Sequence, residues 1–287
     1  PIEEGRGYRD MLSRILYEDK YVIVAYKPAG LAVQTARVGQ SDMVSELKNH
    51  LRRSGDKDRT SAGRGEPYLG IIHRLDQPVE GILVFGKTKA AAASLTGQLR
   101  IQGGEGSFRK QYYAVLCGIP AREAGRLTDC LYKQTVKEGE RTDYKAIVIQ
   151  PDSENQGCSG DRQKPHAAAR EAKGGLAVLE YRILQTDGEQ GLALADIRIH
   201  TGRFHQIRAQ MAHAGTPLLG DQKYGSHQTK SLARNLGIRN VALCAYSLGF
   251  VHPVSKEEME FRIRPENPAF SSFHLMEKPV AGRTWNQ

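Results

Sequence analysis

A chain of 287 residues is long enough to bury a substantial core, as one large domain or as two. No uninterrupted apolar stretch is long enough to cross a bilayer, and residues 1–10 fit neither a secretory signal nor a transit peptide, so we expect a cytoplasmic protein with no membrane partner. The formal net charge of +9, from 41 Lys and Arg against 32 Asp and Glu, favours a polyanionic partner.

The first predicted element is a short strand over residues 21–26. It ends at a turn over residues 27–30, where Pro is followed two positions later by Gly. Ser41 is placed to cap a helix whose apolar residues recur at a spacing of four. Residues 52–66 are charged, rich in Gly and without periodicity, so we expect a loop there.

Residues 71–88 form the most informative segment, because two apolar runs are joined by a short turn that contains Pro and Gly and holds one carboxylate, Asp76. The pattern predicts a β-hairpin, and a rigid turn of this kind can aim a reacting group. The pattern alone leaves a second interpretation open, in which Asp76 only caps its own turn. Thr88 is then placed to cap an Ala-rich helix that ends before Gly103.

β-branched and aromatic residues are enriched in four later segments, which we predict to be strands, at residues 110–118, 144–150, 176–184 and 192–199. Residues 151–175 are polar and almost free of large apolar side chains, which predicts a surface insertion. The sequence shows no internal repeat and no linker between two cores. We therefore expect one α+β domain with a sheet-dominated core.

Another informative segment follows the last predicted strand, where Thr201 is placed to cap a helix. In such a helix Phe204 and Ile207 fall on the apolar face that anchors it in the core. Arg203 would lie in the first turn beside that face. A guanidinium in this position could meet a buried carboxylate.

The histidines of this segment do not indicate a metal site. His205 and Gln206 could equally be residues of the helix surface. His205 and His213 have the wrong spacing for a metal pair on one helix face, and the four cysteines include no Cys-x-x-Cys pair. We therefore expect no bound metal.

Two adjacent tyrosines, Tyr112 and Tyr113, must point to opposite faces of their predicted strand. One ring would face the core, and the other could stack on a nucleobase, although both could also simply pack. Basic residues gather near these segments in two groups, each of which is either a solvated surface or a polyanion-binding one. The first group is Lys87, Lys89, Arg100, Arg109 and Lys110, and the second is Arg198, Arg203 and Arg208.

Taken in order, these motifs resemble the RluA-type pseudouridine synthase family, in the form that lacks an N-terminal S4 domain. The matching residues are 15–19, 27–30, 73–76 (HRLD), 110–112 (KQY), 201–208 (TGRFHQIR), 220–225 (GDQKYG), 243–246 and 252–253. The resemblance implies one catalytic domain over residues 15–265, built on a mixed, mainly antiparallel sheet flanked by helices and loops. Residues 1–14 would be an extension and residues 266–287 a tail.

The activity that the resemblance implies is the isomerisation of specific uridines in structured ribosomal or transfer RNA to pseudouridine, without a cofactor and by a monomer. Asp76 would be the essential nucleophile or electrostatic partner, because glycosidic cleavage develops positive charge on the sugar. Arg203 would pair with Asp76 and keep it ionised. Tyr112 would stack on the target base, with a possible part in removing the proton from carbon 5, and Leu243 would form the apolar floor of the pocket.

A stacked nucleotide must be extruded before such a pocket can reach it, and Arg74 would fill the vacated position or hold the displaced backbone. The sequence departs from the family's commonest forms at Val79–Glu80, Phe204 and Cys244, where Thr-Ser, Thr and His are usual, and we expect such changes to bear on substrate choice. The remaining candidates for RNA contact are Lys87, Lys89, Lys110, His205, Gln206 and Arg208.

Two other classes of protein remain as alternatives. An RNA-binding or ribosome-assembly factor could keep the fold and the basic surface without turnover, but the presence of Asp76, Tyr112 and Arg203 together argues against it. A methyltransferase or deaminase would need a Gly-rich cofactor loop or a zinc-binding His and Cys set, and the sequence contains neither.

Overall fold

The computed structural model describes residues 12–37, 39–54, 66–101, 108–138, 141–149 and 174–275. Its contacts group the chain into two compact units. Unit 1 consists of Pro1–Lys110, Ala245–Glu266 and Met276–Gln287, and unit 2 consists of Gln111–Cys244 and Asn267–Leu275. The expected extension at 1–14, the loop at 52–66 and the insertion at 151–175 lie largely outside the described residues. Of the expected tail at 266–287, residues 266–275 are described, and Asn267–Leu275 belongs to unit 2.

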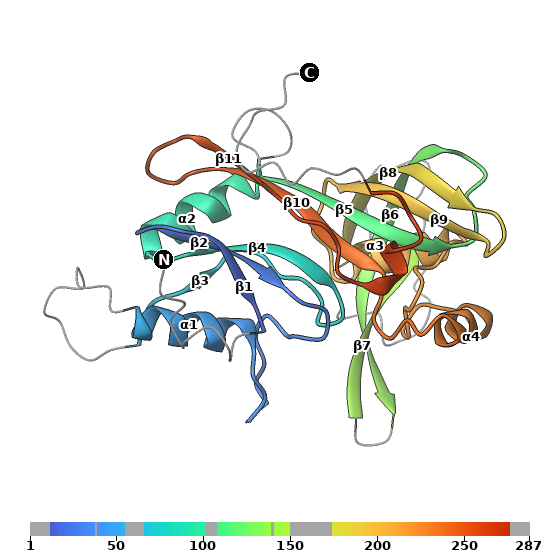
Figure 1. The fold of residues 1–287 in the computed structure, drawn as a ribbon, viewed down its shortest axis with the longest axis horizontal. Coiled ribbons are helices and arrows are strands. Elements are labelled where there is room, and N and C mark those ends of the chain that lie inside the picture. Colours follow the sequence, from blue (N-terminus) through green and yellow to red (C-terminus); the bar gives the residue numbers. More distant parts are fainter. Residues whose placement is uncertain are drawn as a thin grey trace, which may run out of the picture. The chain divides into compact units, whose positions relative to one another are not determined.

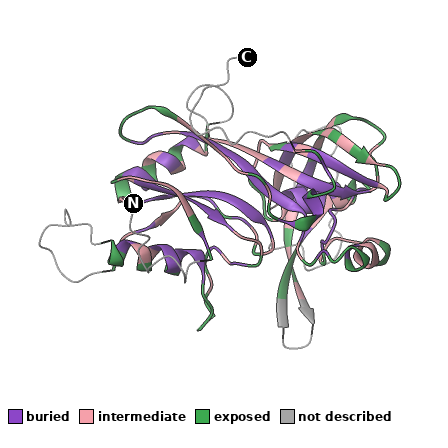
Figure 2. Cartoon of the chain, viewed as in Figure 1, coloured by how far each residue is buried: buried purple, intermediate pink, exposed green. Residues whose placement is uncertain are grey.

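Unit 1 is built on strands from both ends of the chain (Figure 1). They are β1 (Arg14–Glu18), β2 (Val22–Lys27), β3 (Gly70–Ile71), β4 (Glu80–Gly86), β10 (Leu243–Val251), which begins in unit 2, and β11 (Glu258–Arg262). Their order is β1-β2-β4-β10, with β3 on β4 and β11 on β10. Every residue of β2 and β4 is buried, which explains why both appear in the sequence as continuous apolar runs (Figure 2).

Within the described residues of unit 1 there are two helices. Helix α2 (Lys89–Gln98) begins as expected, because the Thr88 side chain accepts the N–H of Ala91 at 3.1 Å. Helix α1 (Met43–Arg53) is capped by Asp42, which accepts the N–H of Ser45 at 2.7 Å, and not by Ser41 as we expected. A carboxylate at the neighbouring position takes the capping role, because a charged acceptor makes the stronger hydrogen bond.

The segment before β4 is only partly the hairpin that the sequence predicts. Strand β3 has two residues, which pair with Phe85 and Gly86, and residues 72–79 run without ladder pairing into β4. The reason is a side chain: His73 Nε2 accepts the backbone N–H of Val84 at 3.3 Å. The imidazole therefore takes a hydrogen bond that a longer partner strand would otherwise make.

Unit 2 contains a five-stranded antiparallel arrangement in the order β5-β9-β8-β6-β7. The strands are β5 (Arg109–Cys117), which begins in unit 1, β6 (Ala124–Glu138), β7 (Arg141–Ile149), β8 (Gly175–Asp187) and β9 (Leu192–Ile199). All four strands predicted in this part of the sequence are confirmed, and β9 has the predicted bounds.

Unit 2 also holds helices α3 (Gln206–His213) and α4 (His227–Asn235) and a short 3₁₀ helix, η2 (Pro268–Phe270). The prediction that Thr201 caps α3 was wrong. Its hydroxyl accepts the N–H of Val178 and donates to Gln206 Oε1, each at 2.9 Å. The N-cap position is His205, with a left-handed φ of 53°, so Arg203 and Phe204 precede the helix, and Phe204 is exposed.

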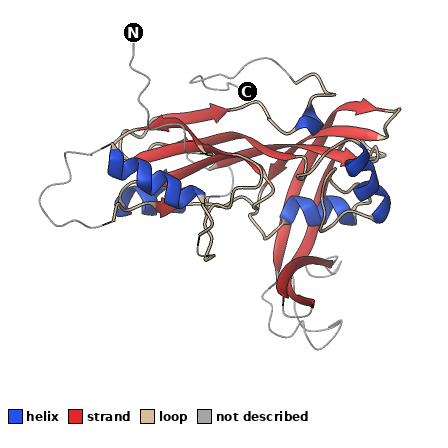
Figure 3. Ribbon diagram, turned by 60° about the horizontal axis from the view of Figure 1, so that its bottom comes forward, coloured by secondary structure: helices blue, strands red, loops and turns tan. Residues whose placement is uncertain are grey.

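The structure is thus α+β, as expected, with strands dominating the core and four α-helices in the described ranges (Figure 3). Among those residues no helix is both long enough and apolar enough to cross a membrane.

Candidate active site

Asp76 lies in the turn that leads into β4, in unit 1. The Asp76 carbonyl accepts the N–H of Val79 at 3.0 Å, which closes the turn. Leu75 on one side and Val79 on the other are buried in the core, while the Asp76 side chain is half-buried. The carboxylate is therefore held between two apolar anchors, which is the rigid placement that a reacting group needs.

A second turn supports this one through Gln77. The Gln77 carbonyl accepts the N–H of Gly30 at 2.8 Å and a proton of Lys27 Nζ at 3.1 Å, and Gln77 Nε2 donates to the Gly30 carbonyl at 2.9 Å. Gly30 has a φ of +93°, a conformation in which a side chain would be strained. The Pro-Gly turn at 27–30 and the Asp76 turn are thus one hydrogen-bonded assembly.

Lys27 also belongs to this assembly, although we predicted no role of its own for it. It is 0% exposed, and its Nζ also donates to the carbonyls of Pro28 at 2.9 Å and Leu31 at 2.7 Å. Burial lowers the pKa of Lys27 to about 7, although the charges of Asp76 and Glu80 oppose this. The available signal was a lysine that ends an apolar strand directly before Pro.

Glu80, at the start of β4, is part of the Val79–Glu80 departure from the family's commonest forms. Glu80 is 1% exposed, and its Oε2 accepts the Tyr26 hydroxyl at 2.8 Å and the N–H of Glu266 at 3.1 Å. Burial, followed by the charge of Glu80, raises the pKa of Tyr26. Val79 and Glu80 are therefore buried, so a substrate would not contact them directly.

The remaining residues of the HRLD and KQY motifs in unit 1 differ in exposure. Arg74 is exposed, and its Nη2 donates to Gln34 Oε1 at 3.1 Å. His73 is buried, and burial lowers its pKa, so the imidazole is neutral. Burial lowers the pKa of Lys110 to about 8, and its Nζ lies 5.7 Å from the ring centroid of Phe108. The RNA contacts expected of Arg74 and Lys110 stay predictions.

Tyr112 and Leu243 belong to unit 2. Tyr112 pairs with Ile197 across β5 and β9 and is 5% exposed, whereas Tyr113 is half-buried, so Tyr112 is the enclosed ring of the pair. Leu243, at the start of β10, is 4% exposed, and the neighbouring Ala242 carbonyl accepts the N–H of Val115 at 3.0 Å. Their expected positions against the target base stay predictions.

Arg203 also belongs to unit 2, where it lies between β9 and α3. Its Nε donates to the Leu176 carbonyl at 3.0 Å, and its backbone N–H donates to Gln206 Oε1 at 3.0 Å. A Cβ added at Gly175 would meet Arg203 Cζ at 2.5 Å, so the guanidinium lies directly against the backbone of β8. The expected ion pair between Arg203 and Asp76 joins residues of different units and stays a prediction.

The structure corrects the RNA contacts expected of Gln206 and Arg208. Gln206 is 4% exposed, and its side chain bonds Thr201, Arg203 and the Val178 carbonyl. Arg208 is 5% exposed, and its Nε and Nη2 donate to the two Asp221 oxygens at 2.7 and 2.8 Å. Burial would raise the pKa of Asp221, but the hydrogen bond and charge of Arg208 lower it below its ordinary value. This bidentate pair occupies Arg208 within the protein.

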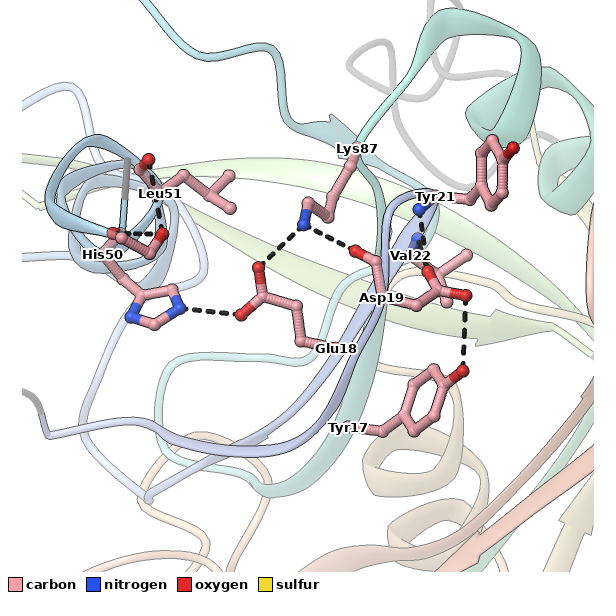
Figure 4. A network of polar contacts seen from close by, with 9 residues as sticks. Tyr17, Glu18, Asp19, Tyr21, Val22, His50, Leu51 and Lys87 are labelled. Carbon is pink, nitrogen blue, oxygen red and sulfur yellow. Dashed lines mark hydrogen bonds and ion pairs between the residues drawn. The ribbon is translucent and has the colours of Figure 1, made fainter. Parts of the chain in front are cut away.

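The RNA contact expected of Lys87 is corrected for the same reason, because its ammonium group is engaged within the protein (Figure 4). Its Nζ donates to Glu18 Oε1 at 2.8 Å and to the Asp19 carbonyl at 2.5 Å, and its side chain is 10% exposed. Glu18 Oε2 also pairs with His50 Nε2 at 2.7 Å, so this network ties the β1–β2 turn to α1 and to the end of β4.

Lys89 and His205 complete the expected RNA-contacting set. Lys89 is exposed at the start of α2, and His205 is half-buried beside Tyr224. The RNA contacts expected of both residues stay predictions. In the part of the chain that the structure describes, no three His, Cys, Asp or Glu side chains gather as a metal site would require.

Comparison with known proteins identifies the family. Residues 21–213 match the family described as RNA pseudouridylate synthase. A Zymomonas mobilis protein named ribosomal large subunit pseudouridine synthase D is 30% identical over 257 residues, which are 88% of this chain and 69% of that protein. An Aquifex aeolicus protein named as an uncharacterised RNA pseudouridine synthase is 32% identical and covers 92% of this chain and 73% of its own length.

The fold is shared with solved structures of similar description. The structure titled human RNA pseudouridylate synthase domain containing 4 superposes with a TM-score of 0.62 at 23% identity, over 88% of this chain and 89% of that one.

A third relative by sequence is a Pasteurella multocida protein named tRNA pseudouridine synthase C, which is 27% identical over 87% of this chain and 90% of its own length. The chain therefore belongs to the RNA pseudouridylate synthase family, whose members are isomerases.

Proposed function

We propose that this chain isomerises uridine in a ribosomal or transfer RNA, with Asp76 as the essential carboxylate. The names of the Zymomonas and Pasteurella relatives support these two RNA classes. The observation that supports the role of Asp76 is its placement on a turn that is held by the hydrogen bonds of Gln77 with Lys27 and Gly30. A turn aspartate that served only its own backbone would not need this second set of hydrogen bonds from Gln77 and Lys27.

The reaction breaks the bond between C1′ and N1 of uridine and forms a bond between C1′ and C5. N1 gains a proton and C5 loses one, so the product is an isomer and no co-reactant is consumed. Bond cleavage develops positive charge at C1′ and negative charge on the uracil, and an ionised Asp76 beside the sugar stabilises the first of these. Arg203 pairs with Asp76, Tyr112 stacks on the uracil, and Leu243 keeps the floor of the pocket dry.

The target nucleotide leaves the stack before it reacts, at a free-energy cost of a few kcal/mol. Arg74 is the proposed residue for this step, because it is exposed two positions from Asp76 on the same supported turn. Lys89, exposed at the start of α2, is proposed to contact phosphate. We propose that the protein acts as a monomer in the cytoplasm, which size-exclusion chromatography and cell fractionation would test.

The test of this function uses unmodified transcripts of ribosomal and transfer RNA. Purified protein is incubated with each transcript, and pseudouridine is mapped by chemical labelling and primer extension. We expect stoichiometric conversion of one or a few uridines in one RNA class. Tight binding to RNA with no converted uridine in any transcript would favour the alternative of an RNA-binding or assembly factor.

A further inference from the structure

An exposed group of aromatic and basic side chains in unit 2 has no role in the chemistry described above. Lys133 of β6 places its Nζ 3.8 Å from the ring centroid of Tyr144 on β7 and 5.1 Å from that of Phe204, which precedes α3. Tyr144 is 41% exposed and Phe204 is 37% exposed. These three residues, here called the aromatic platform, present two rings to solvent with one ammonium group between them.

The Phe204 ring of the platform rests on a second, more buried layer of side chains. Phe204 stacks on His205, with ring centroids 3.7 Å apart and planes 21° from parallel. His205 meets Tyr224 edge-on at 5.6 Å, and its Nδ1 hydrogen-bonds the Tyr224 hydroxyl at 2.9 Å. That hydroxyl also accepts the N–H of Ala146 on β7 at 2.7 Å.

The backbone fixes the same arrangement. His205 has a φ of 53°, in the left-handed region that few residues other than glycine adopt. The N–H of Tyr224 donates to Asp221 Oδ1 at 3.0 Å, and Asp221 is the carboxylate that Arg208 holds in a bidentate pair. Phe204 is therefore exposed on a preorganised support, which lowers the entropy that a ligand would lose by ordering it.

The charge around these rings is complementary to a polyanion. Lys145 places its Nζ 5.5 Å from the Tyr224 ring centroid, so a second ammonium group lies beside the supporting layer. Asp143 also lies here, but Lys223 Nζ pairs with it at 2.6 Å. Aromatic rings that alternate with ammonium groups fit unpaired nucleotides, because bases stack on the rings while cations contact the phosphates. A neutral apolar protein surface would leave these ammonium groups unmatched.

We propose that Phe204 and Tyr144, with Lys133 between them, form a stacking platform for unpaired nucleotides of the RNA substrate that flank the target uridine. This inference rests on the proposed action on RNA. Phe204 directly follows Arg203, the proposed partner of Asp76, so a base stacked on Phe204 belongs to a nucleotide near the target. The platform also gives a role to the departure at Phe204, where the family pattern usually has Thr.

The test compares RNA binding by variants in which an aromatic ring is replaced by a large aliphatic side chain or by another aromatic ring. The probes are a fluorescent oligouridine, the same oligomer with abasic sugars, and a fully paired RNA duplex of equal length. We expect Phe204→Leu and Tyr144→Leu each to weaken oligouridine binding about five- to tenfold, because each loses one stacked base. Binding of the abasic strand and of the duplex stays within about twofold, since neither offers an unpaired base. Phe204→Trp keeps wild-type affinity for oligouridine.

Leu184→Ala, at a β8 residue that is 42% exposed in the same unit, controls for the loss of any exposed apolar side chain and should bind all three probes as wild type does. Lys133→Met should weaken binding of oligouridine and of the abasic strand alike, because it removes a phosphate contact. Thermal unfolding of each variant verifies that the fold is intact.

Two results would overturn the platform. Phe204→Leu and Tyr144→Leu could bind oligouridine as wild type does, which would leave the surface to a protein partner. Alternatively, they could lose affinity equally for the abasic strand, which would show that the rings do not stack on bases. Pseudouridine formation by wild type on its transcript is measured in parallel. Failure of that activity refutes the proposed function, whereas normal activity with unaffected ring variants refutes the platform alone.

Discussion

At the scale of single residues, Lys27 supports the turn that holds Asp76, the proposed catalytic carboxylate. Its Nζ donates to three backbone carbonyls, one of which belongs to Gln77, the residue after Asp76. Loss of this donor would destabilise the turn, because the Pro28 and Leu31 carbonyls would lose it as a partner and an unsatisfied buried acceptor costs about 1–3 kcal/mol. Lys27 is therefore a positioning residue for the Asp76 turn.

The lowered pKa of Lys27 makes a prediction about stability and pH. Between pH 7, about the pKa of Lys27 in the folded protein, and pH 10.5, the ordinary pKa of a lysine, the unfolded chain keeps a proton that the folded protein has released. The unfolding free energy of wild type should therefore rise with pH across this window relative to that of Lys27→Met, by at most about 1.4 kcal/mol per pH unit. Urea unfolding of both proteins from pH 6 to 10 measures this, and a constant difference between them would refute it.

A second prediction concerns Glu80, the buried acid that departs from the family pattern. Glu80→Ala removes the acceptor of the Tyr26 hydroxyl and of the Glu266 N–H, so it should lower the unfolding free energy by about 2–4 kcal/mol. Glu80→Gln keeps one acceptor oxygen and should lose less. Because the side chain is buried, the modified uridine should be the same in both variants. A change of target with unaltered stability would instead make Glu80 a residue of substrate choice.

At the scale of elements, helix α2 lies so close to β4 that the strand ends in glycine. A Cβ added at Gly86 would meet the backbone nitrogen of Ala92 at 2.7 Å, whereas one added at Gly97 of the same helix meets nothing within 4 Å. Helix α2 and strand β4 can pack this closely because Gly86 has no side chain. The sequence indicates both elements but not this approach, because it depends on the distance between them.

These two glycines make a matched pair for measurement. Gly86→Ala should destabilise the protein by about 1–3 kcal/mol, because backbone must move to admit the methyl group. Gly97→Ala should stabilise it by about 0.4–1 kcal/mol, because alanine is the better helix former and restricts the unfolded chain. Thermal unfolding monitored by circular dichroism compares them. Equal effects of the two substitutions would show that α2 is not packed as the structure has it.

Strong local patterns were sufficient for several elements. The bounds of β9 and the Thr88 cap of α2 follow from residues adjacent in sequence. The start of α3 did not, because the Thr201 hydroxyl that would cap it is engaged by Val178 of β8 and by Gln206. The RNA contact predicted for Arg208 failed for the same reason. Nothing in the sequence shows that the Arg208 guanidinium donates to both oxygens of Asp221. Contacts between distant segments decided each of these cases.

At the scale of the whole molecule, charge and family agree on an RNA substrate. The chain carries a formal net charge of +9 and belongs to the RNA pseudouridylate synthase family. The motifs that show the family, and the candidate residues Asp76, Tyr112 and Arg203, were all recognisable in the sequence. Which lysines and arginines remain available to RNA was not, because Lys87 and Arg208 are occupied within the protein.

The remaining basic surface predicts a steep dependence of RNA affinity on salt. Each phosphate contact releases counterions, so affinity for the cognate RNA should fall at least tenfold between about 50 and 200 mM salt. Lys89→Met should reduce the slope of log affinity against log salt by about one, whereas Lys87→Met should leave it unchanged, because Lys87 is committed to Glu18. Equilibrium binding at several salt concentrations gives the slopes. A flat curve for wild type would contradict the assignment of the basic surface.

The most direct test of the central claim is a single-turnover assay of Asp76→Asn on the converted transcript. Because asparagine has nearly the same size but cannot carry the charge that the reaction needs, pseudouridine formation should be abolished. RNA affinity should stay within about tenfold of wild type, since phosphate contacts dominate binding. Asp187→Asn, at the last residue of β8, where the carboxylate accepts the N–H groups of Glu189 and Gln190, is the matched control and should retain wild-type turnover. Turnover by Asp76→Asn at the wild-type rate would contradict the role of Asp76.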